Sequence, residues 1–317
     1  MTRRLLLLLF LLPFAAAAAP MPSARAVAIT FDDLPFAAVP TGEDGYLESM
    51  TARLLHSLQA EQVPAVGFVN EAKLTRDDTL DPLRVDLLRS WIKAGFELGN
   101  HTYSHLSLNR VPLAVFEADL LRGETVTRPL MLSAGKTPRW FRHPFLHQGT
   151  TPEVRRAFQD FLAEHGYAVA PVTVNSAEWV FGAAYARAQA QGDEAAAHRI
   201  GEAYLPYMQA VLAQAEQLAL DLFGRPISHV LVLHANALNA DYFAALAAML
   251  RQRGYRFISL DDALGDSAYA SPLAPTGIEG ESWLEGWARE AGLRPSQPPP
   301  VPGFVKRWAG PAAYQRY

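Results

Sequence analysis

The sequence predicts an α/β fold built on a parallel sheet. Strand-like and helix-like stretches alternate along the chain after its first 26 residues, which is typical of successive βα units. A glycine and an aromatic residue separate a helix-like from a strand-like stretch three times, at Gly95–Phe96, Gly166–Tyr167 and Gly254–Tyr255. Glycine is favoured just past a helix end because it adopts positive φ easily. About seven such units favour closure into a barrel, in which reactive residues lie at the carboxyl ends of the strands.

The elements are expected in strict alternation. The strands are predicted at 27–33, 64–70, 96–102, 139–145, 167–175, 229–236 and 255–264. The helices between them are predicted at Tyr46–Gln62, Pro82–Ala94, Leu113–Leu121 with a possible continuation, Pro152–Glu164 and Asp241–Arg253.

Two regions depart from this alternation. Residues 181–226 are rich in alanine and predict two helices inserted before the last strand that carries a candidate site residue, as a lid or as a flank. Residues 269–317 contain the stretch PSQPPPVPG and are expected to form an irregular C-terminal extension over the barrel. The barrel itself is therefore expected to occupy residues 27–268.

Composition excludes several classes of function. The chain has 317 residues, half of them hydrophobic, which is enough for one large domain. It has no cysteine, so it has no disulfides, no thiolate metal ligands and no cysteine nucleophile. The net charge is −4 and there is no basic run, so no nucleic-acid partner is expected.

Residues 1–26 have the composition of a signal peptide. Arg3 and Arg4 precede an apolar stretch from Leu5 to Phe14, and a tract of small residues follows. The alternative is a membrane anchor, but the apolar stretch is near the lower length limit for spanning a bilayer and contains Pro13. Cleavage after Ala19 or after Ala26 fits the pattern. We therefore expect a periplasmic or extracellular protein with no stable membrane anchor after removal of the signal.

Three residues at predicted strand ends are candidate metal ligands. His101 and His105 lie four residues apart in GNHTYSH, a spacing that lets two imidazoles converge on one ion. Alone, this pair is equally consistent with two histidines at a surface turn. Asp33 follows another strand, in AVAITFDDLP, and completes a three-ligand set that leaves one coordination position for water.

Three further residues are candidates for acid–base chemistry. Asp32 neighbours Asp33 and is suited to act as a general base, held ionised by a partner such as Arg142. Arg142 taken alone, before His-Pro, is more typical of a surface residue. His234 follows an apolar run and is either a hydrogen-bonded core histidine or a general acid.

The motifs TFDD, H-T-x-x-H, R-x-P-F, a downstream Trp and V-L-H occur in this order between about Val27 and Leu264. Together they resemble the polysaccharide deacetylase family, carbohydrate esterase family 4, whose fold is a distorted (β/α)7 barrel. The resemblance implies that Asp32 is the general base, Arg142 its partner and His234 the general acid. It implies Asp33, His101 and His105 as ligands of one divalent metal, with Zn²⁺ expected first and Co²⁺ or Ni²⁺ as alternatives.

The resemblance also assigns the surroundings of these groups. The Pro144–Phe145 segment would contact substrate, with the Phe145 N–H stabilising an oxyanion, and Trp179 would flank His234. Glu178 stands where many members of the family have Asp. His143 and His147 are not general features of the family and are expected either to contact substrate or to be exposed.

The implied activity is removal of N-acetyl groups from an amino-sugar polymer or oligomer, such as peptidoglycan or a chitin-like glycan, so the expected partner is a carbohydrate. Two alternatives use the same site: hydrolysis of another non-peptide C–N bond, and hydrolysis of O-acetyl esters. A third is a non-catalytic carbohydrate-binding relative, which the presence of base, acid and all three ligands disfavours.

Overall fold

The computed structural model describes residues 25–37, 44–272 and 280–311. Most of the expected signal peptide, residues 1–24, lies outside this range. A seven-stranded sheet forms the centre of the molecule, and its strands pair in parallel. Its strands are β1 (Arg25–Leu34), β2 (Ala65–Val69), β5 (Glu97–Asn100), β6 (Trp140–Phe141), β7 (Ala168–Val169), β8 (Ser228–His234) and β9 (Tyr255–Phe257).

The sheet curls into a distorted barrel, as predicted. The strand order is β7-β6-β5-β2-β1-β8, and β9 pairs with the first residues of β1. A parallel bridge between Val174 and Leu231 then joins the segment after β7 to β8. This bridge closes the ring and brings the carboxyl ends of β1, β5, β6 and β8 to one end of the molecule.

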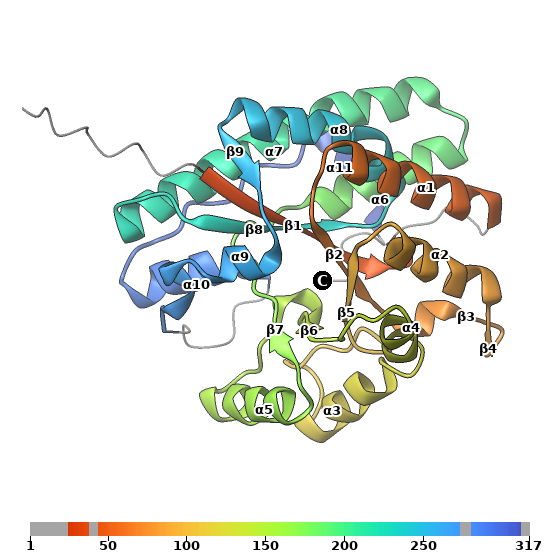
Figure 1. The fold of residues 1–317 in the computed structure, drawn as a ribbon. Helices are drawn as coiled ribbons and strands as arrows, with labels where there is room; N and C mark the ends of the chain where they lie inside the picture. The colour runs from red at the N-terminus through yellow and green to blue at the C-terminus, as the bar shows by residue number, and fades with distance from the viewer. Residues whose placement is uncertain (1–24, 38–43, 273–279, 312–317) are drawn as a thin grey trace, which may run out of the picture.

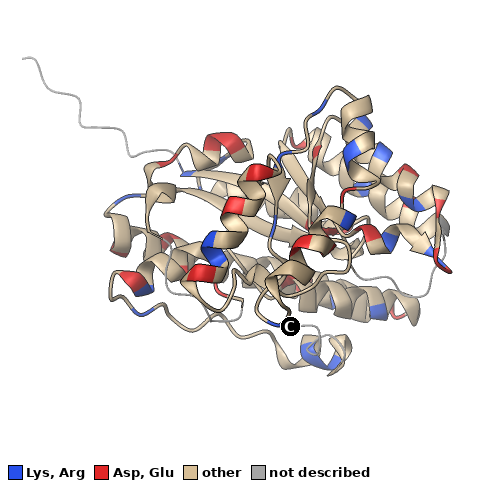
Figure 2. Cartoon of the chain, turned by 90° about the horizontal axis from the view of Figure 1, so that it is seen from below, with Lys and Arg blue, Asp and Glu red and all other residues tan. Residues whose placement is uncertain are grey.

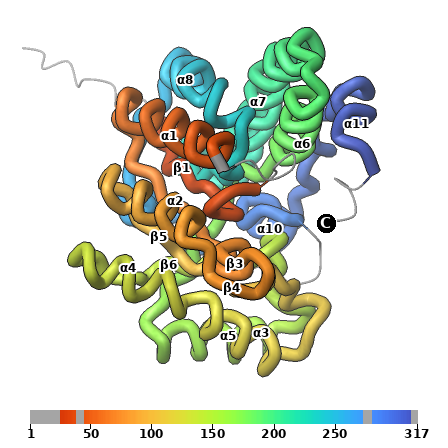
Figure 3. Tube along the Cα trace, turned by 90° about the vertical axis from the view of Figure 1, so that its right-hand side faces the viewer, coloured from red at the N-terminus to blue at the C-terminus, as the bar shows by residue number. Residues whose placement is uncertain are grey.

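Helices surround the strands, with α1, α6, α7 and α8 on one side and α3, α4 and α5 on the opposite side (Figures 1 and 3). The helices are α1 (Asp44–Ala60), α2 (Pro82–Lys93), α3 (Leu113–Arg122), α4 (Thr127–Ser133), α5 (Pro152–Glu164), α6 (Glu178–Ala190), α7 (Glu194–Phe223), α8 (Ala237–Gln252), α9 (Leu260–Leu264), α10 (Trp283–Glu290) and α11 (Gly303–Ala309). Short elements complete the structure: the 3₁₀ turns η1 (Glu71–Leu74), η2 (Pro144–Leu146) and η3 (Ser267–Ala270), and a hairpin of β3 (Thr75–Arg76) and β4 (Thr79–Leu80).

Local sequence explains where the predicted helices begin and end. The Thr151 side chain accepts a hydrogen bond from the Val154 N–H, and proline occupies the first turn of α5. Just beyond the end of this helix, Gly166 has a φ of 75° and reverses the chain towards β7. These signals involve only neighbouring residues, which is why the observed α5 coincides with the predicted span.

The alanine-rich segment forms α6 and α7 and occupies the flank of the barrel. Gly182 lies against Asn236, and Gly201 lies against Tyr242, so both helices approach α8 closely. The first helix begins at Glu178, earlier than predicted, and only its first turn enters the candidate site described below. The remainder of the segment packs on α8 and β8, as expected for a flank rather than a lid.

The C-terminal extension is not irregular as predicted, because it contains α10 and α11. Ser282 and Glu285 form a capping box at the start of α10, in which each side chain bonds the other residue's backbone N–H. The Trp283 N–H donates to Val172 O, and Gln214 Nε2 of α7 donates to Gln297 O. These contacts hold the extension against α7 and the segment after β7.

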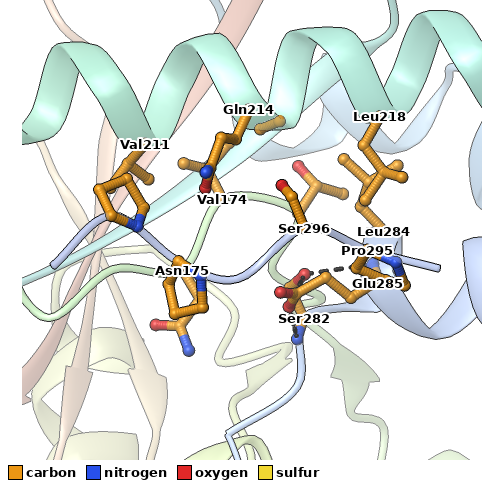
Figure 4. A pocket seen from close by; sticks show the side chains of 14 residues that line it. Val174, Asn175, Val211, Gln214, Leu218, Ser282, Leu284, Glu285, Pro295 and Ser296 are labelled. Carbon is orange, nitrogen blue, oxygen red and sulfur yellow. Dashed lines mark hydrogen bonds between the residues drawn. The ribbon is translucent and has the colours of Figure 1, made fainter.

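One small pocket remains where these three parts meet. Figure 4 shows Val174 and Asn175, the α7 side chain of Gln214, and Ser282 and Pro295 of the extension around it. Its volume is about 50 Å³, far below the roughly 300 Å³ at which ligand pockets begin. We therefore regard it as a packing defect between the extension and the barrel.

Acidic and basic residues are interspersed along the helices (Figure 2). No helix among the described residues is long and apolar enough to cross a membrane.

Candidate active site

The neighbouring carboxylates Asp32 and Asp33 both reach the carboxyl end of the barrel because the end of β1 is irregular. In a regular strand, successive side chains point to opposite faces. Asp33 has a φ of 70°, and the register of β1 against β2 shifts between Phe31 and Leu34. Asp32 stays in register and pairs directly with His234 of β8. The irregularity therefore places two carboxylates and a histidine together.

The loop after β5 carries His101 and His105. Thr102 and His105 have φ values of 65° and 56°, in the left-handed region that side chains rarely adopt. Hydrogen bonds stabilise this conformation: the Thr102 N–H donates to Asn100 Oδ1 over 2.7 Å, and the His105 N–H donates to Thr102 Oγ1 over 3.0 Å. His101 Nδ1 lies 2.8 Å from Arg142 O, which makes Nδ1 the donor and leaves Nε2 as an acceptor.

Asp33, His101 and His105 each offer one ligand-type atom, and these atoms lie within 4.8 Å of one another. Burial lowers the pKa of both histidines to about 3, so both imidazoles are neutral near pH 7 and can ligate a metal. Burial opposes ionisation of Asp33, but the Lys73 ammonium and the neighbouring histidines together outweigh it and hold the pKa of this carboxyl below its usual range. Two neutral imidazoles and a carboxylate are a donor set that suits Zn²⁺.

Asp32 pairs with Arg142 inside the barrel. Arg142 Nη1 lies 3.1 Å and 3.3 Å from the two carboxylate oxygens of Asp32. Arg142 is fully buried, and it also donates to Thr30 Oγ1 and to Ala170 O. Burial raises the pKa of Asp32 by more than Arg142 lowers it. The carboxylate is thus fixed in direction, with a raised proton affinity that suits a general base.

His234 pairs with the buried carboxylate of Glu178 at the start of α6. His234 Nδ1 lies 2.9 Å from Glu178 Oε2. The other oxygen of Glu178 accepts hydrogen bonds from Asn236 Nδ2 at 2.7 Å and Asn239 Nδ2 at 2.8 Å. Tyr204 of α7 donates in turn to Asn239 Oδ1. The inserted helices therefore help to orient His234.

The electrostatic surroundings favour the protonated form of His234. Burial acts to lower its pKa, but the hydrogen bond and charge of Glu178, with the charges of Asp33 and Asp32, raise it overall. A histidine whose pKa is raised stays protonated to a higher pH than usual and can donate a proton to a leaving group.

Two predicted contact residues lie beside these groups. Phe145 has a φ of 57° within η2, between Pro144 and Leu146, and its ring centroid is 4.3 Å from that of His105. Trp179 is partly buried in the first turn of α6, next in sequence to Glu178. Phe145 therefore lies over a candidate ligand, and Trp179 lies on the helix that holds His234.

Neither His143 nor His147 is exposed, so that alternative is wrong. Both side chains are buried. The ring of His143 packs against Phe158 and Trp283, and His147 Nδ1 lies 2.7 Å from Ser107 Oγ. His147 thereby ties η2 to the loop that carries His105.

Sequence reasoning did not identify four residues that contact the site: Thr30, Lys73, Asn236 and Asn239. For Asn236 the sequence offers one signal, because asparagine is a favoured residue at the start of a helix. Its side chain accepts a hydrogen bond from the Asn239 N–H and caps α8. No local pattern marks the other three, because Thr30, Lys73 and Asn239 contact Arg142, Asp33 and Glu178 across 112, 40 and 61 residues.

Parts of the chain are similar to known proteins. A family model described as polysaccharide deacetylase matches residues 20–169. This range includes Asp32, Asp33, His101, His105 and Arg142, whereas Glu178 and His234 lie beyond it. An uncharacterized protein of Bacillus subtilis, YlxY, is 28% identical over 134 residues, which are 42% of this chain and 36% of that protein. The match thus spans about a third of the length of this relative.

Two solved structures are similar to this chain. The chitin deacetylase of the fungal pathogen Colletotrichum lindemuthianum is 21% identical, with a TM-score of 0.51 over 78% of this chain and 92% of that one. A CE4 family pseudoenzyme from Bacillus anthracis is 16% identical, with a TM-score of 0.48 over 77% of this chain and 66% of that one. The family match thus covers residues 20–169, a little under half of the chain, and the barrel fold is shared with the chitin deacetylase.

Proposed function

We propose that the protein is an exported, metal-dependent deacetylase that hydrolyses N-acetyl groups of an amino-sugar polymer or oligomer. One observation carries this proposal: the Asp33–His101–His105 cluster adjoins two separate acid–base pairs, Asp32–Arg142 and His234–Glu178. A protein that only bound carbohydrate or metal would need neither pair.

The metal would be held by Asp33, His101 and His105, with Zn²⁺ as the first candidate and Co²⁺ or Ni²⁺ as alternatives. When bound, such an ion supplies a Lewis acid and lowers the pKa of water from 15.7 towards about 7. The Arg142 carbonyl oxygen supports this role, since it fixes the ring orientation of His101.

Different side chains carry out the two proton transfers of the reaction. Asp32 accepts the proton of the attacking water on its carboxylate, held in place by Arg142. The Phe145 N–H donates to the oxygen of the substrate carbonyl as negative charge develops there. His234, whose Nδ1 is bonded to Glu178, delivers a proton from Nε2 to the leaving amine.

The substrate class is argued from the family and from one named similar structure. That structure is a chitin deacetylase, so its substrate is a polymer of N-acetylated amino sugars. We extend this class to the present chain and place peptidoglycan and chitin-like oligomers first among its substrates.

Export is proposed from the composition of residues 1–24. Arg25 and Ala26 are part of β1: Ala26 is buried and pairs with Ser228, and Arg25 donates to Arg253 O. A cut after Ala26 would remove two paired residues from the central strand, so we place the cut before Arg25. The mature protein would then be periplasmic or extracellular.

The test is acetate release by purified mature protein with added Zn²⁺, measured on peptidoglycan, chitooligosaccharides and acetylated xylan. Release from an N-acetylated glycan, abolished by Asp32→Asn, would support the proposal. Release from acetylated xylan alone would indicate an O-acetyl esterase, and release from small amides alone another C–N hydrolase. Glycan binding without any release would indicate a non-catalytic relative.

A further inference from the structure

The strongest unassigned feature of the site is Lys73, on η1 immediately after β2. Its Nζ lies 3.1 Å from Asp33 Oδ1, and it donates to the carbonyl oxygens of Asp33 and Phe36, each at 3.2 Å. The side chains of Lys73 and Asp33 are 25% and 17% exposed, so water only partly screens their interaction.

The backbone around Lys73 is held firmly, so this contact is not that of a loose surface lysine. Asn70 Nδ2 donates to His101 O over 2.6 Å, and the Ala72 N–H donates to Tyr103 O. Arg84 Nη1 donates to the carbonyl oxygen of Lys73 itself over 3.0 Å. The turn that carries Lys73 is therefore tied directly to the loop that carries His101.

The oxygen that Lys73 approaches is also the one that faces a histidine of the cluster. Asp33 Oδ1 is 3.7 Å from His105 Nε2 and 3.1 Å from Lys73 Nζ. A metal ion ligated by Asp33 and His105 would lie beside this oxygen, next to the ammonium group. The two cations would then share one carboxylate.

We propose that Lys73 sets the metal affinity of this site by competing with the ion for Asp33. The inference rests on the proposed function, because it takes Asp33, His101 and His105 as the ligands. Without the ion, Lys73 neutralises Asp33, which otherwise adjoins the like charge of Asp32. When the ion is bound, the Lys73 ammonium repels it and also weakens the attraction between the ion and the Asp33 carboxylate. The site therefore binds metal reversibly and more weakly than the same three ligands would without the lysine.

The test measures Zn²⁺ affinity by competition with a chromophoric chelator for the wild type and for Lys73→Met, Lys73→Gln and Lys73→Arg. Lys73→Met and Lys73→Gln should lower the Kd by roughly tenfold or more, because removal of a charge this close to a dication is a large effect. Lys73→Gln retains a donor for the two carbonyl oxygens, so it distinguishes the effect of losing the charge from the effect of losing these hydrogen bonds. Lys73→Arg retains the charge and should bind Zn²⁺ about as the wild type does. Lys93→Met, at an exposed lysine of α2, is the matched control.

A second readout follows the protein without metal. In EDTA, Lys73→Met should unfold at a lower temperature than the wild type, since Asp33 loses its counter-charge. Its rise in Tm on addition of Zn²⁺ should be larger than that of the wild type.

Two results would overturn the inference. Weaker Zn²⁺ binding by both Lys73→Met and Lys73→Gln would show that the lysine supports the ligand geometry rather than opposing the ion. Unchanged affinity in both would show that Lys73 and the metal are not coupled. None of these measurements uses acetate release. A lower Kd for Zn²⁺ in Lys73→Met would therefore support the inference even if the protein had no deacetylase activity.

Discussion

At the scale of single residues, the two adjacent carboxylates lie in different electrostatic surroundings. Asp32 is buried beside Arg142, and burial raises its pKa, whereas the pKa of Asp33 is lowered despite burial because Lys73 and the neighbouring histidines surround it. Both differences follow from the irregular end of β1, which turns Asp33 away from the direction of a regular strand. Two neighbours of the same chemical type can therefore take different roles.

This difference predicts separate effects for two isosteric substitutions. Asp32→Asn should keep nearly normal metal content and lower turnover by about 10²–10⁴-fold, the usual contribution of a general base. Asp33→Asn should lose metal, and added metal should restore part of its activity. Bound metal and acetate release would be measured for both variants side by side. Equal metal loss in the two variants, or an active Asp32→Asn enzyme, would refute the assignment of the base.

At the scale of secondary-structure elements, the inserted helices contribute to the site through close packing rather than by covering it. The first turn of α6 supplies Glu178, and Tyr204 of α7 supports Asn239, which donates to the same carboxylate. This arrangement requires α6 to approach α8 closely, and Gly182 permits it. The orientation of His234 therefore depends on the contact between two helices.

Gly182→Ala tests this contact. An added Cβ would lie 2.5 Å from Asn236 Nδ2, which donates to Glu178. Stability should fall by about 1–3 kcal/mol, as for other overpacked sites, and turnover should fall because His234 loses part of its support. Urea unfolding and acetate release measure the two effects. Gly45→Ala in α1 is the matched control, since nothing lies within 4 Å of its Cβ, and an equal loss in both variants would argue against the contact.

The central strand makes a prediction about processing. Because Arg25 and Ala26 pair within β1, the N-terminus of the exported protein should lie before Arg25. Intact-mass measurement of the secreted protein would locate it. A mature chain beginning at Val27 would show that β1 forms without its first two residues and would restore the later cleavage position.

At the scale of the whole molecule, closure of the barrel buries several histidines in neutral form. His229 of β8 is buried beside Thr173, and burial lowers its pKa to about 4. The unfolded chain binds a proton at this residue below its ordinary pKa of about 6.5. Above that pH both states are neutral, so the residue adds no pH dependence. Between pH 6.5 and 4 only the unfolded state gains the proton, and stability falls as the pH falls.

This linkage predicts acid lability that one substitution should reduce. His229 alone would account for a loss of up to about 3 kcal/mol between these two pH values. Urea unfolding in EDTA, measured across this range, should show a shallower pH dependence for His229→Gln than for the wild type. His198→Gln, at an exposed histidine, is the matched control. An unchanged slope in His229→Gln would mean that His229 is protonated in the folded state.

Much of the architecture could be predicted because its signals are local. The Thr151 cap with a proline in the first turn marks the start of α5 within a few residues, and the glycines after helices mark their ends. The same kind of signal is present at Ser282 and Glu285, whose capping-box spacing marks the start of α10 inside the extension that composition alone predicts to be irregular.

By itself, the sequence determined the alternation of strands and helices and the chemical types at the strand ends: Asp32 and Asp33, His101 and His105, Arg142 and His234. Their order along the chain was sufficient to indicate the family. Only the tertiary structure decided which of these groups meet, and with which others. Lys73 contacts Asp33 from 40 residues away, and Glu178 reaches His234 across 56 residues. Such contacts depend on closure of the barrel and on the left-handed backbone of Asp33 and His105, because no periodicity within a single element records what lies beside it after folding.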